Sequence, residues 1–435
     1  MDQREFNWND DLRCVAATDI GMRRTNNQDS YAVVLAEALE AWQQRGHLLM
    51  VADGMGAHAA GELASKLAVD GVAHRYHKFA DQSPPEALRK AVLETNAEIH
   101  RRGQANSDFR NMGTTGSALV LLPQGALVAQ VGDSRIYRVR GNRIEQLTRD
   151  HSLVWELREL GQISEDGDVA NSVPKNVITR SLGPSQHVDT DLEGPFPIEL
   201  GDTYLICSDG LTGKIEDDEL AAILSNLPPD EAAPLLVNLA NLRGGPDNIT
   251  LIIAKVVGPT LVTDHVESAP ITLGAGGATK DRSLIIWVAV AVCGLAAPVL
   301  LLTNNAVSGL VAIVAAGVFA LIAWLAPNLA KKRGVAIKTG QQFGRGPYTD
   351  TECPPGDQVG QLLARISRDL PKSVEQQGYE IDLTEFESHC ESAEKAQTAG
   401  NLQDAMIRRA RGIRVLMRAV REEQNKNASD SAIEL

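Results

Sequence analysis

Hydrophobic and polar positions follow two periods along the first part of the chain. Short apolar or alternating runs are typical of strands, and they occur at Leu12–Thr18, Leu48–Ala52, Ser117–Leu122, Leu127–Val131, Ile136–Arg140, Tyr204–Cys207 and Ile249–Val256. Longer segments with apolar residues three and four positions apart are typical of helices, and they occur at Ala59–Phe79, Pro85–Arg102, Leu153–Leu160 and Asp217–Leu227. Several strands follow one another without a helix between them, which favours antiparallel sheets over a doubly wound parallel sheet. The pattern therefore predicts an α+β domain over residues 11–257.

The pattern changes after residue 257. Residues 258–282 are rich in Gly, Thr and Pro and have no period, so we expect a linker there. Two uncharged apolar stretches follow, at 284–302 and 306–326. Each is long enough to cross a bilayer core as a helix, and the short turn between them predicts a transmembrane hairpin. Two buried core helices are the alternative.

Charged residues around the two apolar stretches predict their orientation. Lys280 and Arg282 precede the first stretch, whereas residues 331–333, with the sequence KKR, follow the second, and the connecting turn contains no Lys or Arg. Because positive charge favours the cytoplasmic side, we expect two spans in an inner or plasma membrane, with both flanking parts in the cytoplasm. The five cysteines are widely spaced and form no C-x-x-C pair, which fits a reducing compartment.

The remainder of the chain is polar. We expect a linker or mixed segment at 334–378 and two helices at 379–425, joined at Gly400–Asn401. The two helices weakly resemble a single tetratricopeptide-type unit. A helical hairpin without a partner and one that binds a protein partner both remain open. Residues 426–435 are predicted to be a disordered tail.

Net charge limits the choice of partners. The chain has 42 Lys and Arg against 56 Asp and Glu, which gives a formal charge of -14. This acidic balance argues against nucleic acid as a partner, because a phosphate backbone requires a basic surface. The N-terminal sequence MDQREFNWND is acidic and polar, so no secretory signal is expected there. Nothing in the composition indicates the oligomeric state.

Candidate chemistry lies at the ends of the predicted strands. Asp53 directly follows the apolar run Leu48–Ala52 and precedes Gly54. Four further aspartates stand at or near strand ends: Asp29, Asp133, Asp209 and Asp247. One such Asp is usually a turn or helix cap, but several clustered carboxylates are costly without a counter-ion. Asp oxygens suit Mg²⁺ or Mn²⁺, and no His-rich or Cys-rich pattern indicates zinc. The sequence therefore predicts a divalent-metal centre.

Ordered motifs around these aspartates resemble a known family. They are GMRRTNNQDS, VADGMGAHAAGE, MGTTGSALV, VGDSRIY, QLTRDHSL, CSDGLT and GGPDNIT. In order and spacing they are similar to the metal-dependent type 2C protein phosphatases (the PPM family), especially the bacterial serine/threonine members. The resemblance covers residues 11–257. It implies a sandwich of two antiparallel β-sheets flanked by helices, with a binuclear metal centre at one end.

The resemblance also implies a set of metal ligands. Asp53 would bridge two Mg²⁺ or Mn²⁺ ions, and the carbonyl of Gly54 would bind one of them. Asp209 and Asp247 would complete the ligands of the other ion. Asp133, together with Asp209, matches the position that holds a third, weaker ion.

Three other residues match catalytic positions of the family, and two depart from its usual pattern. Arg24 matches the phosphate-binding arginine, and Asp29 matches a carboxylate that orients metal-bound water. His58 is a candidate general acid for the leaving group, or else a surface or supporting histidine. Ala57 replaces a glycine, which is tolerable if its φ is negative. Gln28 replaces a common Glu and removes one charge near the metals.

These observations predict a membrane-anchored, metal-dependent phosphatase that acts on phosphoserine and phosphothreonine in phosphorylated proteins. Two ions suit this reaction because together they activate water and stabilise the attacking and leaving oxygens. The alternative is a catalytically inactive phosphatase-fold scaffold, or a membrane protein that only binds phosphoproteins. An inactive copy would be expected to lack at least one ligand, and all of the matching aspartates are present. The sequence does not indicate which phosphoprotein is the substrate.

Overall fold

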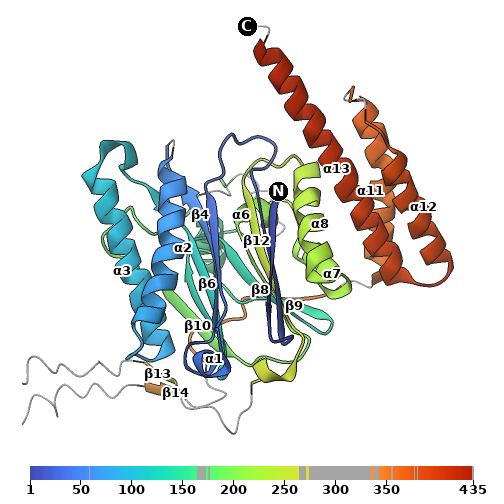
Figure 1. Cartoon of the computed structure of the whole chain (residues 1–435). Coiled ribbons are helices and arrows are strands. Elements are labelled where there is room, and N and C mark those ends of the chain that lie inside the picture. Colours follow the sequence, from blue (N-terminus) through green and yellow to red (C-terminus); the bar gives the residue numbers. More distant parts are fainter. Residues whose placement is uncertain are drawn as a thin grey trace, which may run out of the picture. The chain divides into compact units, whose positions relative to one another are not determined.

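Two antiparallel β-sheets, packed face to face, form the centre of the main unit of the protein (Figure 1). The computed structural model describes residues 1–57, 59–163, 173–174, 177–263, 271–273, 335–337, 342–353, 356–376, 378–379 and 381–433. Helices cover the outer faces of both sheets (Figure 1). This arrangement confirms the α+β class and the two flanked antiparallel sheets that the sequence predicts.

In the described residues the larger sheet has the strand order β1-β2-β12-β11-β8-β9-β15. Every neighbouring pair is antiparallel. The strands span Asp2–Trp8 (β1), Leu12–Asp19 (β2), Ile249–Val256 (β12), Thr203–Cys207 (β11), Arg135–Arg140 (β8), Arg143–Gln146 (β9) and Thr349–Glu352 (β15).

The other sheet has the order β10-β7-β6-β4-β3, and a short strand, β5, pairs with the end of β4. Its neighbouring strands are also antiparallel. The strands span Asp191–Phe196 (β10), Gly125–Val131 (β7), Gly116–Leu122 (β6), His47–Met55 (β4), Asp29–Val34 (β3) and Gly113–Thr114 (β5).

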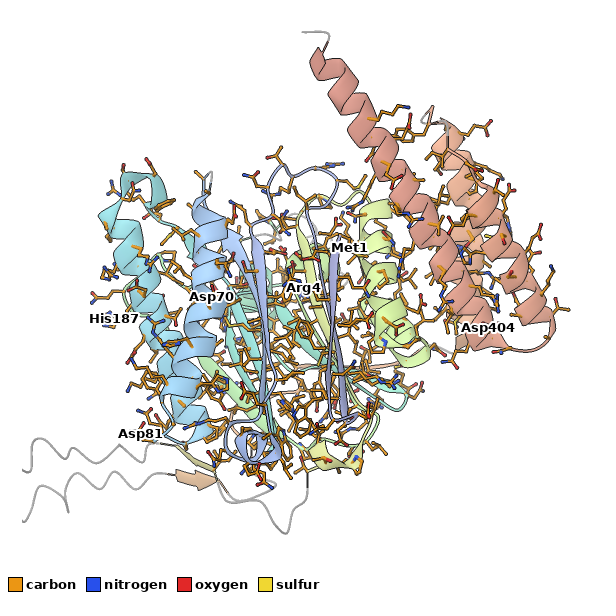
Figure 2. The ribbon with its side chains drawn as sticks, viewed as in Figure 1. Met1, Arg4, Asp70, Asp81, His187 and Asp404 are labelled. Atoms are coloured by element: carbon orange, nitrogen blue, oxygen red, sulfur yellow. The ribbon has the colours of Figure 1, made fainter. Side chains whose placement is uncertain are left out.

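Alternating side chains of the central strands build two cores. In β11, Tyr204 and Ile206 belong to the core between the sheets, together with Leu49 of β4. Leu205 and Cys207 point the other way, into the core beneath the helices. Because successive side chains of a strand point to opposite faces, a strand buried on both sides is apolar throughout. The side chains that fill this interior are drawn in Figure 2.

Helices pack on each outer face. On one side α2 (Ala60–Lys78) contacts β3 and β4, and α3 (Pro84–Ala105) lies beside α2 (Figure 1). On the other side α8 (Pro229–Leu242) contacts β2 and β12. The remaining helices of this region are α1 (Leu39–Arg45), α4 (Leu153–Glu159), α6 (Asp209–Thr212) and α7 (Asp217–Asn226), with 3₁₀ turns at Ser107–Phe109 and Pro259–Leu261.

Three helices form the C-terminal part, which we call the tail. They are α11 (Gly356–Gln376), α12 (Thr384–Thr398) and α13 (Leu402–Ile433). Both α11 and α12 pack against α13. The turn between α12 and α13 contains Gly400 at φ +79°, a left-handed conformation that glycine adopts without strain. This is the position at which the sequence predicts the two helices to join.

Two predicted boundaries differ from the structure. The sandwich extends beyond 11–257, because β1 and β15 are edge strands of its larger sheet. An edge strand lacks a strong apolar pattern since much of it faces water, and β15 has the polar sequence TDTE. At 334–378, where a linker or a mixed segment is expected, the described residues include β15 and α11, as a mixed segment would. The expected disordered tail, 426–435, is helical as far as Ile433, because α13 continues through it.

A second, small unit contains a two-stranded antiparallel ladder of β13 (Ile271–Leu273) and β14 (Val335–Ile337). These strands flank the predicted transmembrane hairpin, whose spans at 284–302 and 306–326 lie outside the described residues. In the part of the chain that the structure describes, no helix has the length and apolar character required to cross a membrane. The start of the expected linker is folded: Leu261 is buried, and Thr263 N donates a hydrogen bond to Ile198 O.

Candidate active site

Two carboxylates meet across neighbouring strands at one end of the sandwich. Asp29, at the start of β3, is paired with Asp53 near the end of β4. The backbone of Asp53 is held by hydrogen bonds from Thr115 N at 2.9 Å and Thr114 Oγ1 at 2.8 Å to its carbonyl oxygen. Its own N–H donates to Thr115 Oγ1 at 2.8 Å. These bonds fix the backbone of Asp53 and therefore the position from which its side chain extends.

The larger sheet contributes two more carboxylates to the same end. Asp209 opens α6 directly after β11, and Asp247 lies just before β12. Asp133 follows β7 of the other sheet. The pKa of Asp53 is raised well above its ordinary value, first by burial and then by the charges of the four aspartates at 29, 209, 133 and 247. The structure therefore brings together all five aspartates selected from the sequence.

Burial and mutual repulsion also raise the pKa values of three neighbouring carboxylates, Asp29, Asp133 and Asp209. Burial raises the pKa of Asp29 to about 7, and the charges of Asp209 and Asp247 add to the effect. Burial and the charge of Asp209 raise the pKa of Asp133 to about 8. The pKa of Asp209 is also raised, by burial and then by Asp247. Such a cluster requires positive charge to be fully ionised at neutral pH.

Unpartnered oxygens in the cluster indicate which positive charge fits. The Oδ1 atoms of Asp29, Asp133 and Asp209 are buried without a hydrogen-bond partner, and buried polar atoms are rarely left so. Carboxylate oxygens without nitrogen or sulfur ligands suit Mg²⁺ or Mn²⁺. Among the described residues, no three acidic, His or Cys side chains already surround a single point in ligand geometry. The donor set fits a hard divalent cation.

Arg24 lies at the open side of the cluster, on the loop between β2 and β3. Its Nη2 donates to Asp247 Oδ2 at 2.7 Å, and its side chain is half exposed. The hydrogen bond to Asp247 and the charges of Asp53 and Asp209 raise the pKa of the guanidinium. A planar fork of donors that is partly accessible to solvent can bind a phosphoryl group with two hydrogen bonds.

Gly54 is required by close packing. A Cβ atom at this position would lie 2.1 Å from the Gly61 carbonyl oxygen and 2.5 Å from that of Gln28. Its N–H donates to Gln28 O at 3.1 Å. The glycine therefore allows the ends of β3, β4 and α2 to meet beside Asp53. Whether its carbonyl binds an ion stays a prediction.

Comparison with known proteins identifies the fold and its activity. The family profile for protein phosphatase 2C matches residues 22–230. A protein phosphatase 2C-type protein of Streptococcus pyogenes is 41% identical over 54% of this chain and 93% of its own length. The serine/threonine phosphatase stp of Listeria welshimeri is 36% identical, over 55% and 93% respectively. The chain belongs to the protein phosphatase 2C family. It is a serine/threonine protein phosphatase.

A solved structure agrees with this assignment. The serine/threonine phosphatase of S. agalactiae is 34% identical to this phosphatase, with a TM-score of 0.50, and the match covers 56% of this chain and 99% of that one. Phosphatases of the family use Mg²⁺ or Mn²⁺, which agrees with the oxygen-only donor set described above. The matches favour the enzyme over the inactive scaffold that the sequence left open.

The two departures from the family pattern are accommodated locally. Ala57 is not among the non-glycine residues with positive φ in the described chain, which are Asn9, Asp10 and Asn111, so its conformation is unstrained. The side chain of Gln28 donates through Nε2 to Gly56 O at 3.3 Å. His58, the candidate general acid, lies outside the described residues, and its role stays a prediction.

Two supporting residues were missed by the sequence analysis. His151 accepts a hydrogen bond through Nδ1 from Gly132 N at 3.0 Å and so holds the residue before Asp133. The side chain of Asn248 donates to Ile20 O and Asn26 O, both at 3.0 Å, and fixes the loop that carries Arg24. Both residues stand inside quoted motifs, RDHSL and PDNIT. Their position in those motifs was the signal in the sequence that could have identified them as supporting residues.

Proposed function

We propose that the phosphatase hydrolyses phosphoserine and phosphothreonine through two divalent ions held by the aspartate cluster. Asp53 and the Gly54 carbonyl, with Asp209 and Asp247, would hold the two ions, and Asp133 would contribute to a third, weaker site. When bound, the ions would supply the Lewis acidity that activates water and neutralises phosphoryl charge. The observation that carries the proposal is the convergence of five carboxylates, of which Asp29, Asp133 and Asp209 have buried oxygens without a hydrogen-bond partner.

The remaining residues have roles that follow from their positions. The guanidinium of Arg24, accessible at the mouth of the cluster, would bind the phosphoryl oxygens and orient the phosphorus toward the attacking water. Asp29 would orient that water, because its Oδ2 is fixed by Ser208 Oγ at 2.8 Å while its Oδ1 is unpartnered. His58 is proposed as the proton donor to the leaving serine or threonine oxygen.

Substitution of single ligands tests the metal proposal. Asp53→Asn and Asp209→Asn should each reduce kcat/KM for an aryl phosphate by more than about 100-fold, because even outer-shell changes at metal sites cost 10- to 100-fold. Circular dichroism should show that both variants remain folded. Glu199→Gln, at an exposed carboxylate, is the matched control and should keep wild-type activity. EDTA should inhibit the wild type and Mn²⁺ should restore it; full activity in EDTA would contradict the proposal.

We further propose that the phosphatase is anchored in an inner or plasma membrane by a helical hairpin at 284–302 and 306–326. Two features of the described residues support this arrangement. The strands that flank the hairpin are hydrogen-bonded to each other, with Ile271 opposite Ile337 and Leu273 opposite Val335. An even number of membrane spans returns the chain to the side from which it entered, and the paired strands bring the two ends of the segment side by side.

The main unit supports the same topology. The chain leaves it at Thr263, which is bonded to Ile198, and returns at Phe343, which exchanges two backbone hydrogen bonds with Gly194. Departure and return are thus both fixed within a few residues of β10. The basic residues at both flanks favour the cytoplasm for the catalytic unit and the tail, where phosphorylated proteins are the expected substrates.

Reporter fusions test this topology. A reporter active only in the oxidising outer compartment should give signal when fused after Asn304, in the turn between the spans, and no signal when fused after Leu435. A cytoplasmic reporter should give the reverse result. Outer-compartment signal at Leu435 would exclude the hairpin.

A further inference from the structure

The tail is packed against the phosphatase domain. Helix α13 contacts α8, and α11 contacts α7. Buried apolar residues of the tail join the same core as the outer face of the larger sheet; they include Leu363, Leu370, Phe386, Ile413, Leu416 and Val420. The profile of the phosphatase family ends before the tail, at residue 230. The contact is therefore a property of this chain that the family match does not describe.

One ion pair in this contact reaches a buried carboxylate of the catalytic domain. Arg421 of α13 donates through Nη1 to Asp19 Oδ2 and through Nη2 to Asp19 Oδ1, both at 2.6 Å. The side chain of Asp19 is completely buried, and that of Arg421 is 22% exposed. The amino group of Met1 also lies 3.0 Å from Asp19 Oδ2. Bidentate pairing of this kind fixes the relative orientation of the guanidinium and the carboxylate as well as the distance between them.

Asp19 in turn holds the loop that carries Arg24. Asp19 is the last residue of β2, and its Oδ1 accepts hydrogen bonds from Gly21 N at 2.9 Å and Asn241 Nδ2 at 3.2 Å. Met22, which follows Gly21 along the chain, donates its N–H to Gly245 O at 2.8 Å. Arg24 is only two residues further along this loop.

The same loop touches the segment that carries Asp247. A Cβ atom at Gly21 would lie 2.2 Å from the Asp247 carbonyl oxygen, so the two backbones are in direct contact. Arg24 itself is bonded to the Asp247 side chain. A continuous chain of hydrogen bonds and contacts thus runs from Arg421 through Asp19 and Gly21 to both Arg24 and Asp247.

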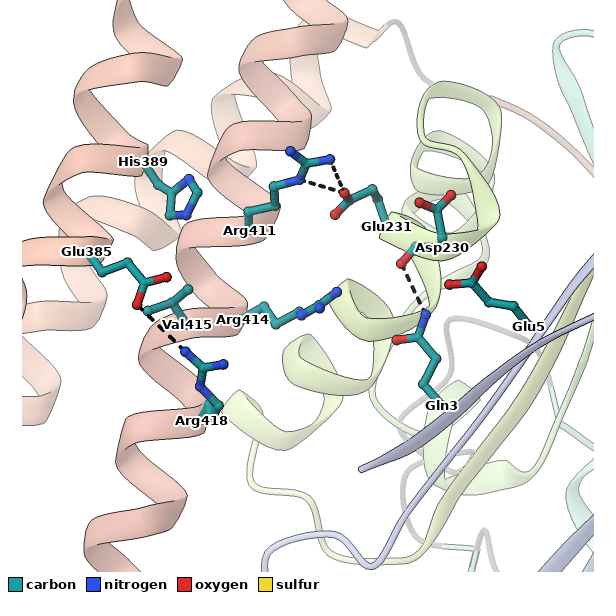
Figure 3. Close-up of a pocket in the computed structure, with 10 residues that line it drawn as sticks. All are labelled: Gln3, Glu5, Asp230, Glu231, Glu385, His389, Arg411, Arg414, Val415 and Arg418. Carbon is teal, nitrogen blue, oxygen red and sulfur yellow. Dashed lines mark hydrogen bonds and ion pairs between the residues drawn. The ribbon is translucent and has the colours of Figure 1, made fainter.

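A second arginine of α13 makes a similar ion pair that does not reach the site. Arg411 donates through Nε to Glu231 Oε1 of α8 at 2.6 Å, and the Glu231 side chain is 8% exposed (Figure 3). This pair lines a polar cavity of about 660 Å³ between α8 and α13, into which Arg414 also points (Figure 3). Among the bonds found in the described residues, the Glu231 side chain makes none to the Arg24 loop.

We propose that Arg421 is a positioning residue for the phosphate-binding site and that the tail is thereby a working part of the phosphatase. Arg421 acts through Asp19, whose hydrogen bonds hold the Arg24 loop against the segment of Asp247. Loss of this ion pair loosens phosphate binding and metal binding together. The proposal rests on the roles given to Arg24 and Asp247 under the proposed function.

The test compares Arg421→Met with Arg411→Met in the full-length chain. For Arg421→Met, the KM for an aryl phosphate, the inhibition constant of inorganic phosphate and the Mn²⁺ concentration for half-maximal activity should each rise about five- to tenfold, as for a typical coupling between sites. The kcat at saturating substrate and Mn²⁺ should change less. Arg411→Met should leave all of these values within about twofold of wild type, because contacts that do not share partners act independently.

A conservative variant and a second readout complete the test. Arg421→Lys keeps the charge but loses the bidentate fork, so its effect should lie between wild type and Arg421→Met, and it replaces Arg421→Met if that variant does not fold. Hydrogen exchange of the backbone amides of residues 20–28 should be faster in Arg421→Met and unchanged in Arg411→Met.

The outcomes separate this proposal from the proposed function. Equal effects of the two methionine variants, or no effect of Arg421→Met, would overturn the positioning role. A wild-type chain without Mn²⁺-dependent hydrolysis would overturn the proposed function instead. Hydrogen exchange alone would then decide whether Arg421 holds the loop.

Discussion

Asp29 and Asp133 show at the residue scale what the aspartate cluster costs the protein without an ion. Their pKa values are raised to about 7 and about 8. Without metal, the folded protein therefore holds protons at pH values at which the unfolded chain has already released them. Stability then decreases as pH rises, because deprotonation favours the unfolded state.

This argument gives a pH dependence. In EDTA, the thermal midpoint of the wild type should fall as pH rises from about 4 to about 8, the window between the unfolded and folded pKa values. Asp133→Asn removes one of the titrating groups, so the thermal midpoint of this variant should fall less over the same pH window. Saturating Mn²⁺ should remove the decrease, because the ion favours the ionised carboxylates. A midpoint in EDTA that rises between pH 5 and 8, with no difference between the proteins, would contradict the raised pKa values.

Residues of the site differ in how far the sequence predicts them. Asp53 and Asp209 were predictable because Asp53 directly follows the apolar run Leu48–Ala52 and Asp209 stands two residues after the apolar run Tyr204–Cys207, each within a short motif. The contact of Asp19 with Arg421 was not predictable, since the two residues are 402 positions apart and neither has a local signal. Long-range ion pairs depend on how elements pack, which local periodicity does not contain.

The segment after the proposed hairpin shows, at the element scale, how a weak strand is held. Glu193 of β10 is 2% exposed. Its Oε2 accepts hydrogen bonds from Arg345 N at 2.9 Å and Gly346 N at 3.0 Å, and its Oε1 accepts one from Tyr348 OH at 2.5 Å. These bonds fix the chain just before β15 pairs with β9. Strand β15 has no apolar side chains to pack, so these hydrogen bonds to Glu193 help to position it at the edge of the sheet.

Removal of this carboxylate should weaken the folded state. Glu193→Ala leaves the buried N–H of Gly346 and the half-buried N–H of Arg345 without an acceptor, so we expect a loss of about 3 kcal/mol in the free energy of unfolding. Glu199→Ala, at an exposed salt bridge with Arg140, should cost less than about 1 kcal/mol. Urea unfolding followed by tryptophan fluorescence measures both. Equal losses would mean that Glu193 has no special anchoring role.

Prediction succeeded for the strands that are apolar along most of their length. Strands β4, β6 and β12 are buried along nearly their whole length, and all three were predicted. Strand β1, with a mostly exposed or half-buried pattern, and β15 were missed because edge strands need little apolar surface. The same is true of the last turns of α13, whose polar side chains give no helical pattern.

At the scale of the whole molecule, the proposed membrane segment is an insertion between two fixed points. Thr263 is bonded to Ile198 and Phe343 to Gly194, four positions apart along one strand segment. The sandwich and the tail share one apolar core on either side of this insertion.

Replacement of residues 264–341 by a short Gly/Ser linker should give a water-soluble phosphatase. The linker has to span only the distance between Gly194 and Ile198, four positions apart and so about 13 Å at about 3.3 Å per residue, and a few residues suffice. We expect kcat and KM for an aryl phosphate within about twofold of the full chain, because distant independent changes rarely alter a site. Size-exclusion chromatography without detergent and steady-state kinetics check both points. An inactive but soluble product would show that the insertion contributes to the site.

The two ends of the sandwich also differ in what they face. Strand β12 begins beside Asp247 and has 8 residues, after which the chain continues to Thr263; at about 3.3 Å per residue the strand separates the two ends by about 26 Å. Thr263 and Phe343, where the chain leaves and re-enters the main unit, are bonded to Ile198 and Gly194, which lie toward the start of β7 and so away from Asp133 at its other end. The two points of connection therefore leave the mouth of the site unobstructed, whatever the inserted segment attaches to.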